Sequence, residues 1–164
     1  MKQEEILQKL GQIAIFDELK EREADLKRLL DIIKLKSYPK GAVIIREGDI
    51  GSEMYIVYRG SVEIQKQTRA GDTYTVVKLK AENNVFFGEI ALVDDDKRSA
   101  TVIALEDSEF LVLNKDDFLK LGKTNPEIAL PITQAIARIL ASRLRKTTMD
   151  MLTIFDALVN EIQS

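Results

Sequence analysis

Apolar residues recur along the chain at two different spacings. Near the N-terminus they recur every three or four positions, first as Ile6, Leu7 and Leu10 and then from Leu26 to Ile33. This spacing places them on one face of an α-helix. The pattern therefore predicts N-terminal helices over residues 1–34, which cover one end of the molecule.

From residue 35 to residue 113 the apolar residues form short continuous or alternating runs, such as 73–79, 100–104 and 109–113, with glycines between many of the runs. Many short strands separated by turn residues are typical of antiparallel sheets that close on themselves, because closure leaves few exposed edges. The sequence predicts an α+β fold that is mainly β. Its centre is an antiparallel double-sheet β-roll, similar to a jelly roll, flanked by N-terminal and C-terminal helices.

Residues 114–164 return to helical spacing. We expect Asn114 to cap a short helix that contains Phe118 and Leu121. Asn125 followed by Pro126 predicts the start of a long helix, because the missing N–H of a proline costs nothing in the first turn. The C-terminal part of the chain is therefore predicted to be helical throughout.

An apolar stripe follows the long C-terminal helix, and its members are Ile136, Leu140, Leu144, Met151, Phe155, Leu158 and Ile162. The stripe has two interpretations. It packs back on the roll, which is the commoner fate of an amphipathic helix, or it pairs with a second copy as a parallel coiled coil and makes a homodimer.

The composition of the 164 residues suits a single domain with a sizeable core. The 24 Lys and Arg residues against 27 Asp and Glu give a net charge of -3, without a basic face that would suit nucleic acid. There is no cysteine, no leader pattern and no long apolar run. These features predict a cytoplasmic protein without disulfides or a membrane span, and with neither nucleic acid nor a membrane as a partner.

Catalysis is not expected from this sequence. The chain has no histidine and no cysteine, which removes the common general base, the usual zinc ligands and the cysteine nucleophile. The carboxylates at 94–96 are adjacent in one predicted loop, whereas paired catalytic carboxylates need separate and differently tuned environments. We therefore expect a binding protein without a metal or an enzymatic activity.

Residues 87–101 carry the most specific chemistry in the chain. Gly88 can adopt a turn that a side chain would block, and the free N–H groups of the short helix that follows suit an anion. Arg98 offers a planar fork of donors for phosphate oxygens. Glu89 is acceptor-only when ionised, so it suits the hydroxyls of a sugar. One short segment thus offers donors for a phosphate and acceptors for a sugar.

This segment, the glycine-containing block 41–49 and the block 54–62 occur in an order and spacing that resemble the cyclic-nucleotide-binding domain. That module occurs in catabolite activator proteins, regulatory subunits of cyclic-AMP-dependent protein kinase and gated channels. The resemblance covers nearly the whole chain and implies a β-roll with a phosphate-binding cassette at 87–101. It implies cyclic AMP as the favoured ligand, cyclic GMP as the alternative, and no further cofactor.

The resemblance also implies a role for individual residues. Glu89 would bind the ribose 2'-hydroxyl, and Arg98 would bind the exocyclic phosphate oxygens. The rest of the phosphate is assigned to Ser99 and to the backbone of Gly88, Ile90 and Ala91. A hydroxyl beside the arginine also favours guanine in some relatives, so the base is the least determined part of the ligand.

The remaining walls of the site are expected to be mostly apolar. The candidates from strands beside the cassette are Val62, Val77, Leu79, Val85 and Ala100. The candidates that would cover the base from the C-terminal helix are Arg143, Thr147 and Thr148. Two alignments of this helix differ by about one turn, so either the arginine or the threonine pair faces the pocket, and a wholly exposed polar face is the third alternative.

Two features depart from the family pattern. Lys97 stands where many members have proline, and the aspartates at 94–96 would repel a phosphate. Exposed charge pairs are worth about 1 kcal/mol or less, and a bond from arginine to a charged oxygen about 1.5–3 kcal/mol. We therefore expect binding to be weakened and not abolished.

The sequence predicts a sensor whose ligand moves the C-terminal helices and whose effector protein is unknown. Two alternatives remain open. Glu89 and Arg98 could form an ordinary surface ion pair, or the roll could be ligand-free and serve as a protein-interaction module.

Overall fold

The computed structural model describes residues 2–95 and 97–163. Asp96, one of the three aspartates of the cassette loop, lies outside the described residues. The helices and 3-10 turns are α1 (Lys2–Gly11), η1 (Ala14–Leu19), α2 (Glu23–Leu30), η2 (Ala81–Asn83), η3 (Glu89–Leu92), α3 (Lys115–Thr124) and α4 (Pro126–Gln163). The strands are β1 (Ile33–Tyr38), β2 (Val43–Ile45), β3 (Glu53–Arg59), β4 (Ser61–Gln67), β5 (Thr73–Lys80), β6 (Phe86–Phe87), β7 (Thr101–Ala104) and β8 (Ser108–Asn114).

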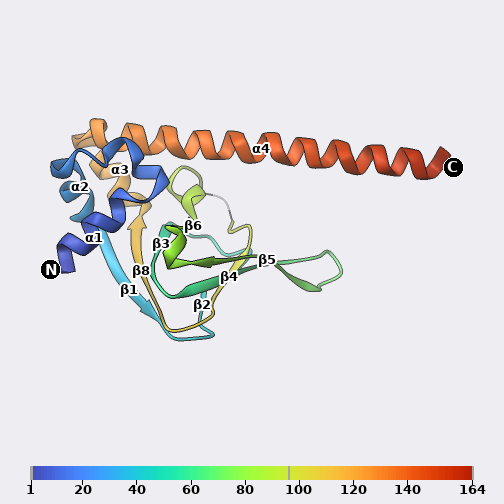
Figure 1. Ribbon diagram of the computed structural model, residues 1–164, viewed down its shortest axis with the longest axis horizontal. Coiled ribbons are helices and arrows are strands. Elements are labelled where there is room, and N and C mark those ends of the chain that lie inside the picture. The colour runs from blue at the N-terminus through green and yellow to red at the C-terminus, as the bar shows by residue number, and fades with distance from the viewer. Residues whose placement is uncertain (1, 96, 164) are drawn as a thin grey trace.

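The strands form two antiparallel sheets, with the orders β1-β8-β3-β6 and β2-β7-β4-β5. The two sheets face each other and form the roll below the helices (Figure 1). The predicted mainly β, double-sheet fold with flanking helices is confirmed. The first strand begins at Ile33, two residues before the expected boundary of the roll, because its register continues to Leu113 of β8.

One apolar core lies between the two sheets. Val57, Phe110 and Val62 are fully buried in it, and the ring of Tyr55 stacks on Phe87 at 5.2 Å between centroids. Alternate residues of antiparallel strands point to the same face, so each sheet supplies its inward side chains to this core.

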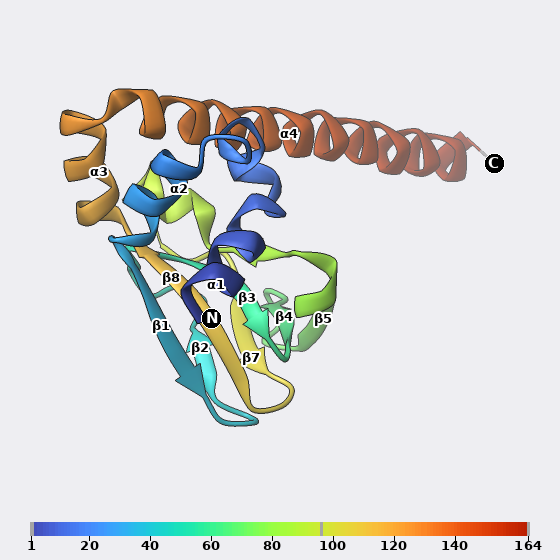
Figure 2. The same cartoon turned by 60° about the vertical axis from the view of Figure 1, so that its left-hand side comes forward.

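A second core lies where the helices meet the sheet of β1, β8 and β3. Residues of α1, η1 and α2 pack there with Phe118 of α3 and with Ile128, Ile132 and Ile136 of α4. An ion pair joins the same elements: Nη2 of Arg138 on α4 lies 2.8 Å from Oε1 of Glu18 on η1. Figure 2 shows these helices gathered at one end of the roll. The first part of α4 is thus held by the N-terminal helices.

The helix starts follow local sequence chemistry. The side chain of Asn114 accepts a bond from the N–H of Asp116 at 2.9 Å, as expected for the cap of α3. The long helix begins at Pro126 and continues through Pro131 to its end, for 38 residues. At 1.5 Å per residue this helix is about 57 Å long.

The apolar side chains of α4 that pack on the rest of the chain belong to its first part, as far as Leu140. Residues 141–158 are exposed, and the helix projects beyond the roll (Figure 1). In this structure the distal stripe therefore does not pack back on the roll.

Candidate functional site

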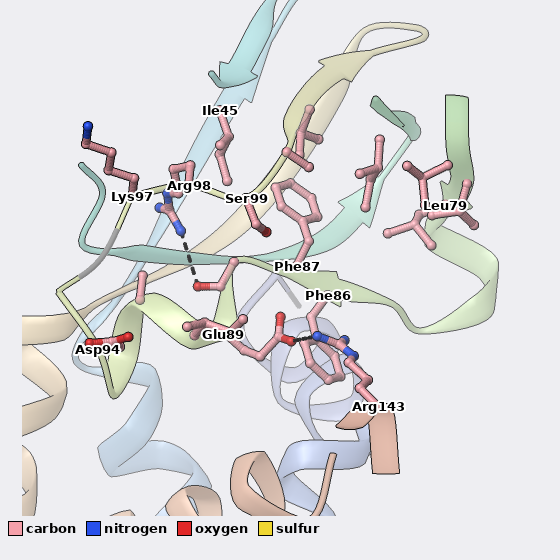
Figure 3. Close-up of a pocket in the computed structure, with 18 residues that line it drawn as sticks. Ile45, Leu79, Phe86, Phe87, Glu89, Asp94, Lys97, Arg98, Ser99 and Arg143 are labelled. Atoms are coloured by element: carbon pink, nitrogen blue, oxygen red, sulfur yellow. Dashed lines mark hydrogen bonds and ion pairs between the residues drawn. The ribbon is translucent and has the colours of Figure 1, made fainter. Parts of the chain in front are cut away.

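A cavity of about 620 Å³ lies between the sheet that contains β4 and β5, the 3-10 turn η3 and one side of α4. Figure 3 shows Arg98 and Ser99 on one side of this cavity, Leu79 on the opposite side, and Glu89 pointing toward Arg143. The size is within the range of small-molecule sites, which is about 300–1,000 Å³.

Gly88 begins the turn that carries Glu89. Its φ is +76°, a left-handed value that L side chains rarely adopt. A Cβ at this position would lie 3.0 Å from the main-chain oxygen of Glu53, so glycine is required both by conformation and by space. The N–H of Ala91 already donates to the oxygen of Gly88 at 3.1 Å. The backbone donor expected from Ala91 is therefore already bonded within the turn.

Arg98 is half-buried at the edge of the cavity. Its Nη2 donates to the main-chain oxygen of Glu53 at 2.6 Å, and its Nη1 donates to the oxygen of Gly88 at 3.3 Å. Burial lowers the pKa of Arg98, and the nearby Tyr55, Glu53 and Glu89 act in the opposite direction. An arginine nonetheless stays charged in proteins, so the cavity has a cation at this edge.

Glu89 is a buried carboxylate, with 2% of the residue exposed. It forms an ion pair with Nη1 of Arg143, which lies on α4 and has a side chain 56% exposed. Glu89 is thus not a surface residue paired with Arg98. A buried carboxylate needs a partner, and here that partner comes from the long helix.

The far end of the cavity is apolar. Ile64 of β4 and Val76, Val77 and Leu79 of β5 line it. The cavity thus has a charged end near η3 and an apolar end that suits a flat apolar group.

The structure brings most of the predicted site residues to this cavity. The predicted residues that line it are Val77, Leu79, Gly88, Glu89, Ile90, Ala91, Arg98, Ser99, Ala100 and Arg143. They come from β5, η3, the loop before β7 and α4, so the site is assembled from segments that are far apart in the sequence.

Two of the predicted wall residues lie elsewhere. Val62 is fully buried between the sheets, where it is paired with Leu79 and Ala104. Ile64 lies two positions further on the same face of β4 and lines the cavity in its place. Val85 packs against the inner core, and its oxygen accepts a bond from the N–H of Val57 at 3.0 Å.

The predicted threonines of the base cap also lie outside the lining. Thr147 and Thr148 are exposed on α4, and the hydroxyl of Thr148 bonds the oxygen of Leu144 one turn earlier at 3.0 Å. Among the three alternatives for this helix, the structure brings Arg143 to the cavity.

Several lining residues were not predicted, and they are Ile45, Ile64, Val76, Phe86, Phe87, Asp94, Lys97 and Val102. The alternation of β4 contained a signal for Ile64, and the position of Phe86 and Phe87 directly before Gly88 and Glu89 contained another. Asp94 and Lys97 had been considered only as departures from the family pattern.

The structure describes two of the three loop aspartates, Asp94 and Asp95, and they differ in their surroundings. Asp94 lines the cavity, whereas Asp95 is bonded to Lys115 of α3 at 2.6 Å. Pairing of Asp95 reduces the repulsion that a phosphate would meet. Within residues 2–95 and 97–163, no group of three or more carboxylates is arranged to hold a metal ion.

Comparison with known proteins identifies the family. The sequence profile of the cyclic nucleotide-binding domain matches residues 35–125, more than half of the chain. The cyclic AMP receptor protein of Thermus thermophilus is 33% identical over 137 residues, which are 84% of this chain and 60% of that protein. Human cGMP-dependent protein kinase 2 is 36% identical over 107 residues, which are 65% of this chain and 14% of the kinase.

Solved structures agree. The crystal structure of the Thermus thermophilus catabolite activator protein has a TM-score of 0.69 at 30% identity, over 78% of this chain and 57% of that one. A cAMP-bound structure described as PfPKA-R has a TM-score of 0.63 at 29% identity, over 71% of this chain and 40% of that one. The chain therefore belongs to the cyclic nucleotide-binding domain family, whose members are regulatory, ligand-binding modules.

The chain spans only part of these relatives, from 14% of the kinase to 60% of the receptor protein. In the described part of the chain, no helix has the length and apolar character needed to cross a membrane.

Proposed function

We propose that this chain is a cytoplasmic sensor domain that binds a cyclic mononucleotide, with cyclic AMP favoured over cyclic GMP, and that it acts by binding and not by catalysis. One observation carries the proposal. A buried carboxylate, Glu89, and a half-buried guanidinium, Arg98, line one cavity whose other end is apolar. A cyclic nucleotide has an anionic phosphate, a sugar hydroxyl and a flat base, and these three parts match the three parts of the cavity.

In the proposed complex the phosphate lies at the charged end. Arg98 donates to its oxygens, with Ser99 and the main-chain N–H groups of Gly88 and Ile90 as further donors. The N–H of Ala91 already donates to Gly88, so it contributes less than the sequence suggested. Glu89 accepts a bond from the ribose 2'-hydroxyl.

The base lies against the apolar end of the cavity, between β5 and α4. Val77 and Leu79 offer apolar contact area and no side-chain hydrogen bonds, so they do not distinguish one purine from another. Arg143 lines the cavity from α4, and stacking of the base on its guanidinium would not require one particular purine.

Glu89 also supplies the proposed coupling to α4. Its carboxylate has two oxygens, and Arg143 holds one of them from the helix. A ribose hydroxyl that bonds the same carboxylate changes the strength of this ion pair. A ligand can shift a conformational equilibrium only by the difference between its contacts in the two states, and this shared carboxylate provides such a difference.

We also propose that the exposed part of α4 forms a homodimer. Leu144, Met151 and Leu158 are spaced by seven, as are Thr148, Phe155 and Ile162, so the two sets occupy the a and d positions of a coiled coil. Leu144, Met151, Phe155 and Leu158 are 53–68% exposed. Large apolar side chains that line one helix face in water usually mark an interaction surface. A different protein on the same stripe is the alternative, and it would suit a ligand-free interaction module.

Calorimetric titration with cyclic AMP, cyclic GMP and a cyclic dinucleotide tests the ligand. We expect micromolar or tighter binding of cyclic AMP, weaker binding of cyclic GMP and no binding of the dinucleotide. The absence of heat with all three, at millimolar nucleotide, would refute the sensor and leave the interaction module.

Hydrogen exchange of α4 tests the coupling separately from binding. In Arg143→Ala we expect faster exchange of the amides near residues 139–147 in the ligand-free protein, because the tie to Glu89 is lost. Arg145→Ala changes an exposed arginine two positions away and is the matched control. Equal exchange in the two variants would contradict the coupling through Arg143.

A further inference from the structure

Gly51 differs from the other glycines of the roll. Glycines at five positions, Gly41, Gly48, Gly60, Gly71 and Gly88, have a positive φ, and Gly51 does not. Its backbone conformation therefore does not require glycine. A Cβ at this position would lie 2.1 Å from Nε of Arg98 and 2.6 Å from its Cζ and Nη2, and these are the three nearest atoms. What a side chain at 51 would meet is the guanidinium of Arg98.

The guanidinium lies in a slot made mostly of backbone. Gly51 forms one side, and Gly88 forms another, where a Cβ would lie 2.9 Å from Nη1. The main-chain oxygens of Glu53 and Gly88 accept bonds from its two terminal nitrogens. Arg98 also lines a second, smaller cavity of about 260 Å³ that includes Gly51 and Tyr55. Arg98 thus lies beside both cavities, and Figure 3 shows the bond from its guanidinium to the main-chain oxygen of Gly88, just before η3.

The backbone of this region is held independently of the guanidinium. The N–H of Arg98 donates to the oxygen of Asp49 at 2.8 Å, and the N–H of Gly48 donates to the oxygen of Arg98 at 2.9 Å. Ile50 and Lys97 form a bridge beside them. The three atoms nearest to a methyl group at 51 all belong to the end of the Arg98 side chain, and none is a backbone atom. Such a change displaces the guanidinium and leaves the turn in place.

We propose that Gly51 is a positioning residue for phosphate binding, because its missing side chain makes the slot that holds the Arg98 guanidinium at the cavity edge. This inference rests on the proposed binding of a cyclic nucleotide. A long flexible side chain loses rotamer freedom when it binds a ligand, and a side chain that is already held in place loses less. The slot therefore raises affinity without contacting the ligand.

The test is a double-mutant cycle measured by calorimetry with cyclic AMP. We expect Gly51→Ala to weaken binding about tenfold, by displacing the guanidinium. In the Arg98→Ala background the same change should cost nothing further, since the group it displaces is absent. The matched control is Gly11→Ala, a glycine without positive φ where a Cβ would meet only Cβ of Lys20 at 4.0 Å. Unchanged affinity in Gly51→Ala, or an equal loss in both backgrounds, would overturn the proposal.

A second measurement needs no nucleotide. The Nε–H resonance of Arg98 in a ¹⁵N spectrum, assigned by its disappearance in Arg98→Lys, reports whether the guanidinium is held. We expect Gly51→Ala to shift and broaden this resonance and Gly11→Ala to leave it unchanged. A resonance that is unchanged in Gly51→Ala would overturn the proposal that Gly51 makes the slot. If the wild type binds no cyclic nucleotide, the proposed function fails, and this resonance alone decides whether Gly51 holds the guanidinium.

Discussion

The cavity and the distal half of α4 differ in whether their side chains find partners within the chain. At the cavity, Glu89 is buried and paired, and Arg98 is bonded to two main-chain oxygens. Along α4, residues 141–158 are exposed, although many of them are large and apolar. One region has its polar groups paired within the chain, whereas the other leaves apolar surface uncovered.

The difference separates two tasks. Binding of a small ion needs donors and acceptors held in fixed positions, and a single domain can provide these. Transmission of a signal needs a partner protein or a second copy of the chain. The exposed apolar stripe of α4 suits such a contact, because burial of apolar surface is favourable. Arg143 lies at the boundary between the two regions, on α4 and against Glu89. The following changes act on one region or the other, in order of decreasing effect.

Removal of the Arg98 side chain should have the largest effect on the cavity. We expect Arg98→Ala to weaken binding of cyclic AMP at least tenfold, because each bond to a charged oxygen is worth about 1.5–3 kcal/mol and 1.4 kcal/mol is one decade. Calorimetry measures the affinity, and thermal unfolding of the same variant checks that the fold is intact. An unchanged dissociation constant in a folded variant would remove Arg98 from the proposed phosphate site.

The proposed role of Glu89 predicts a dependence on one hydroxyl of the ligand. We expect 2'-deoxy cyclic AMP to bind the wild type about tenfold more weakly than cyclic AMP, because one bond to a carboxylate is lost. In Glu89→Gln the two ligands should bind almost equally, since the neutral amide makes a weaker bond. Competition with a fluorescent nucleotide measures both ratios. A preference for the ribose form that persists in the variant would assign the hydroxyl to another residue.

A change in the distal stripe should affect assembly and spare the cavity. We expect Phe155→Asp to convert a dimer to a monomer, because a charge would have to be buried in the seam. Affinity for cyclic AMP should change less than about threefold. Light scattering measures the mass, and Asp156→Ala on the neighbouring position is the control. A wild type with the mass of one chain, with and without nucleotide, would contradict the homodimer.

The smallest effect is expected from the ion pair between Lys36 and Glu53, whose main-chain oxygen bonds the Arg98 guanidinium. Lys36 bonds both carboxylate oxygens of Glu53, at 2.7 and 2.9 Å. Burial acts to raise the pKa of Glu53, but the bonds from Lys36 and Tyr55 outweigh it, so the pKa lies below its usual value. A lowered pKa stabilises the fold above the unfolded pKa, and this contribution disappears as the pH falls through the folded one.

Lys36→Met should therefore lower the free energy of unfolding by about 1 kcal/mol or less at pH 7, because the pair is partly exposed. The difference from the wild type should shrink as the pH falls from the unfolded pKa of glutamate, about 4.3, through the lowered folded pKa of Glu53. The comparison is therefore made at pH 7 and at a pH below both values. Urea unfolding at the two pH values measures the difference. A difference of the same size at both would assign the effect to lost packing of the lysine stem.

Residue patterns anticipated some parts of the site better than others. The cassette residues Gly88, Glu89 and Arg98 line the cavity, because a turn and the side chains around it are encoded within a few positions. On β4 the prediction named Val62, whereas the residue that lines the cavity is Ile64, two positions further on the same face. Alternation defines a face, whereas the depth of the core along the strand depends on the opposite sheet.

Sequence alone determined the β-roll, the helical ends and the glycine turn of the cassette, because periodicity, caps and turn chemistry act between near neighbours. Only the tertiary structure decided that Arg143, and not Thr147 or Thr148, meets Glu89, and that Gly51 makes room for Arg98. These contacts join segments brought together by folding of the whole roll. Their geometry follows from helix rotation and sheet packing, to which every part of the chain contributes.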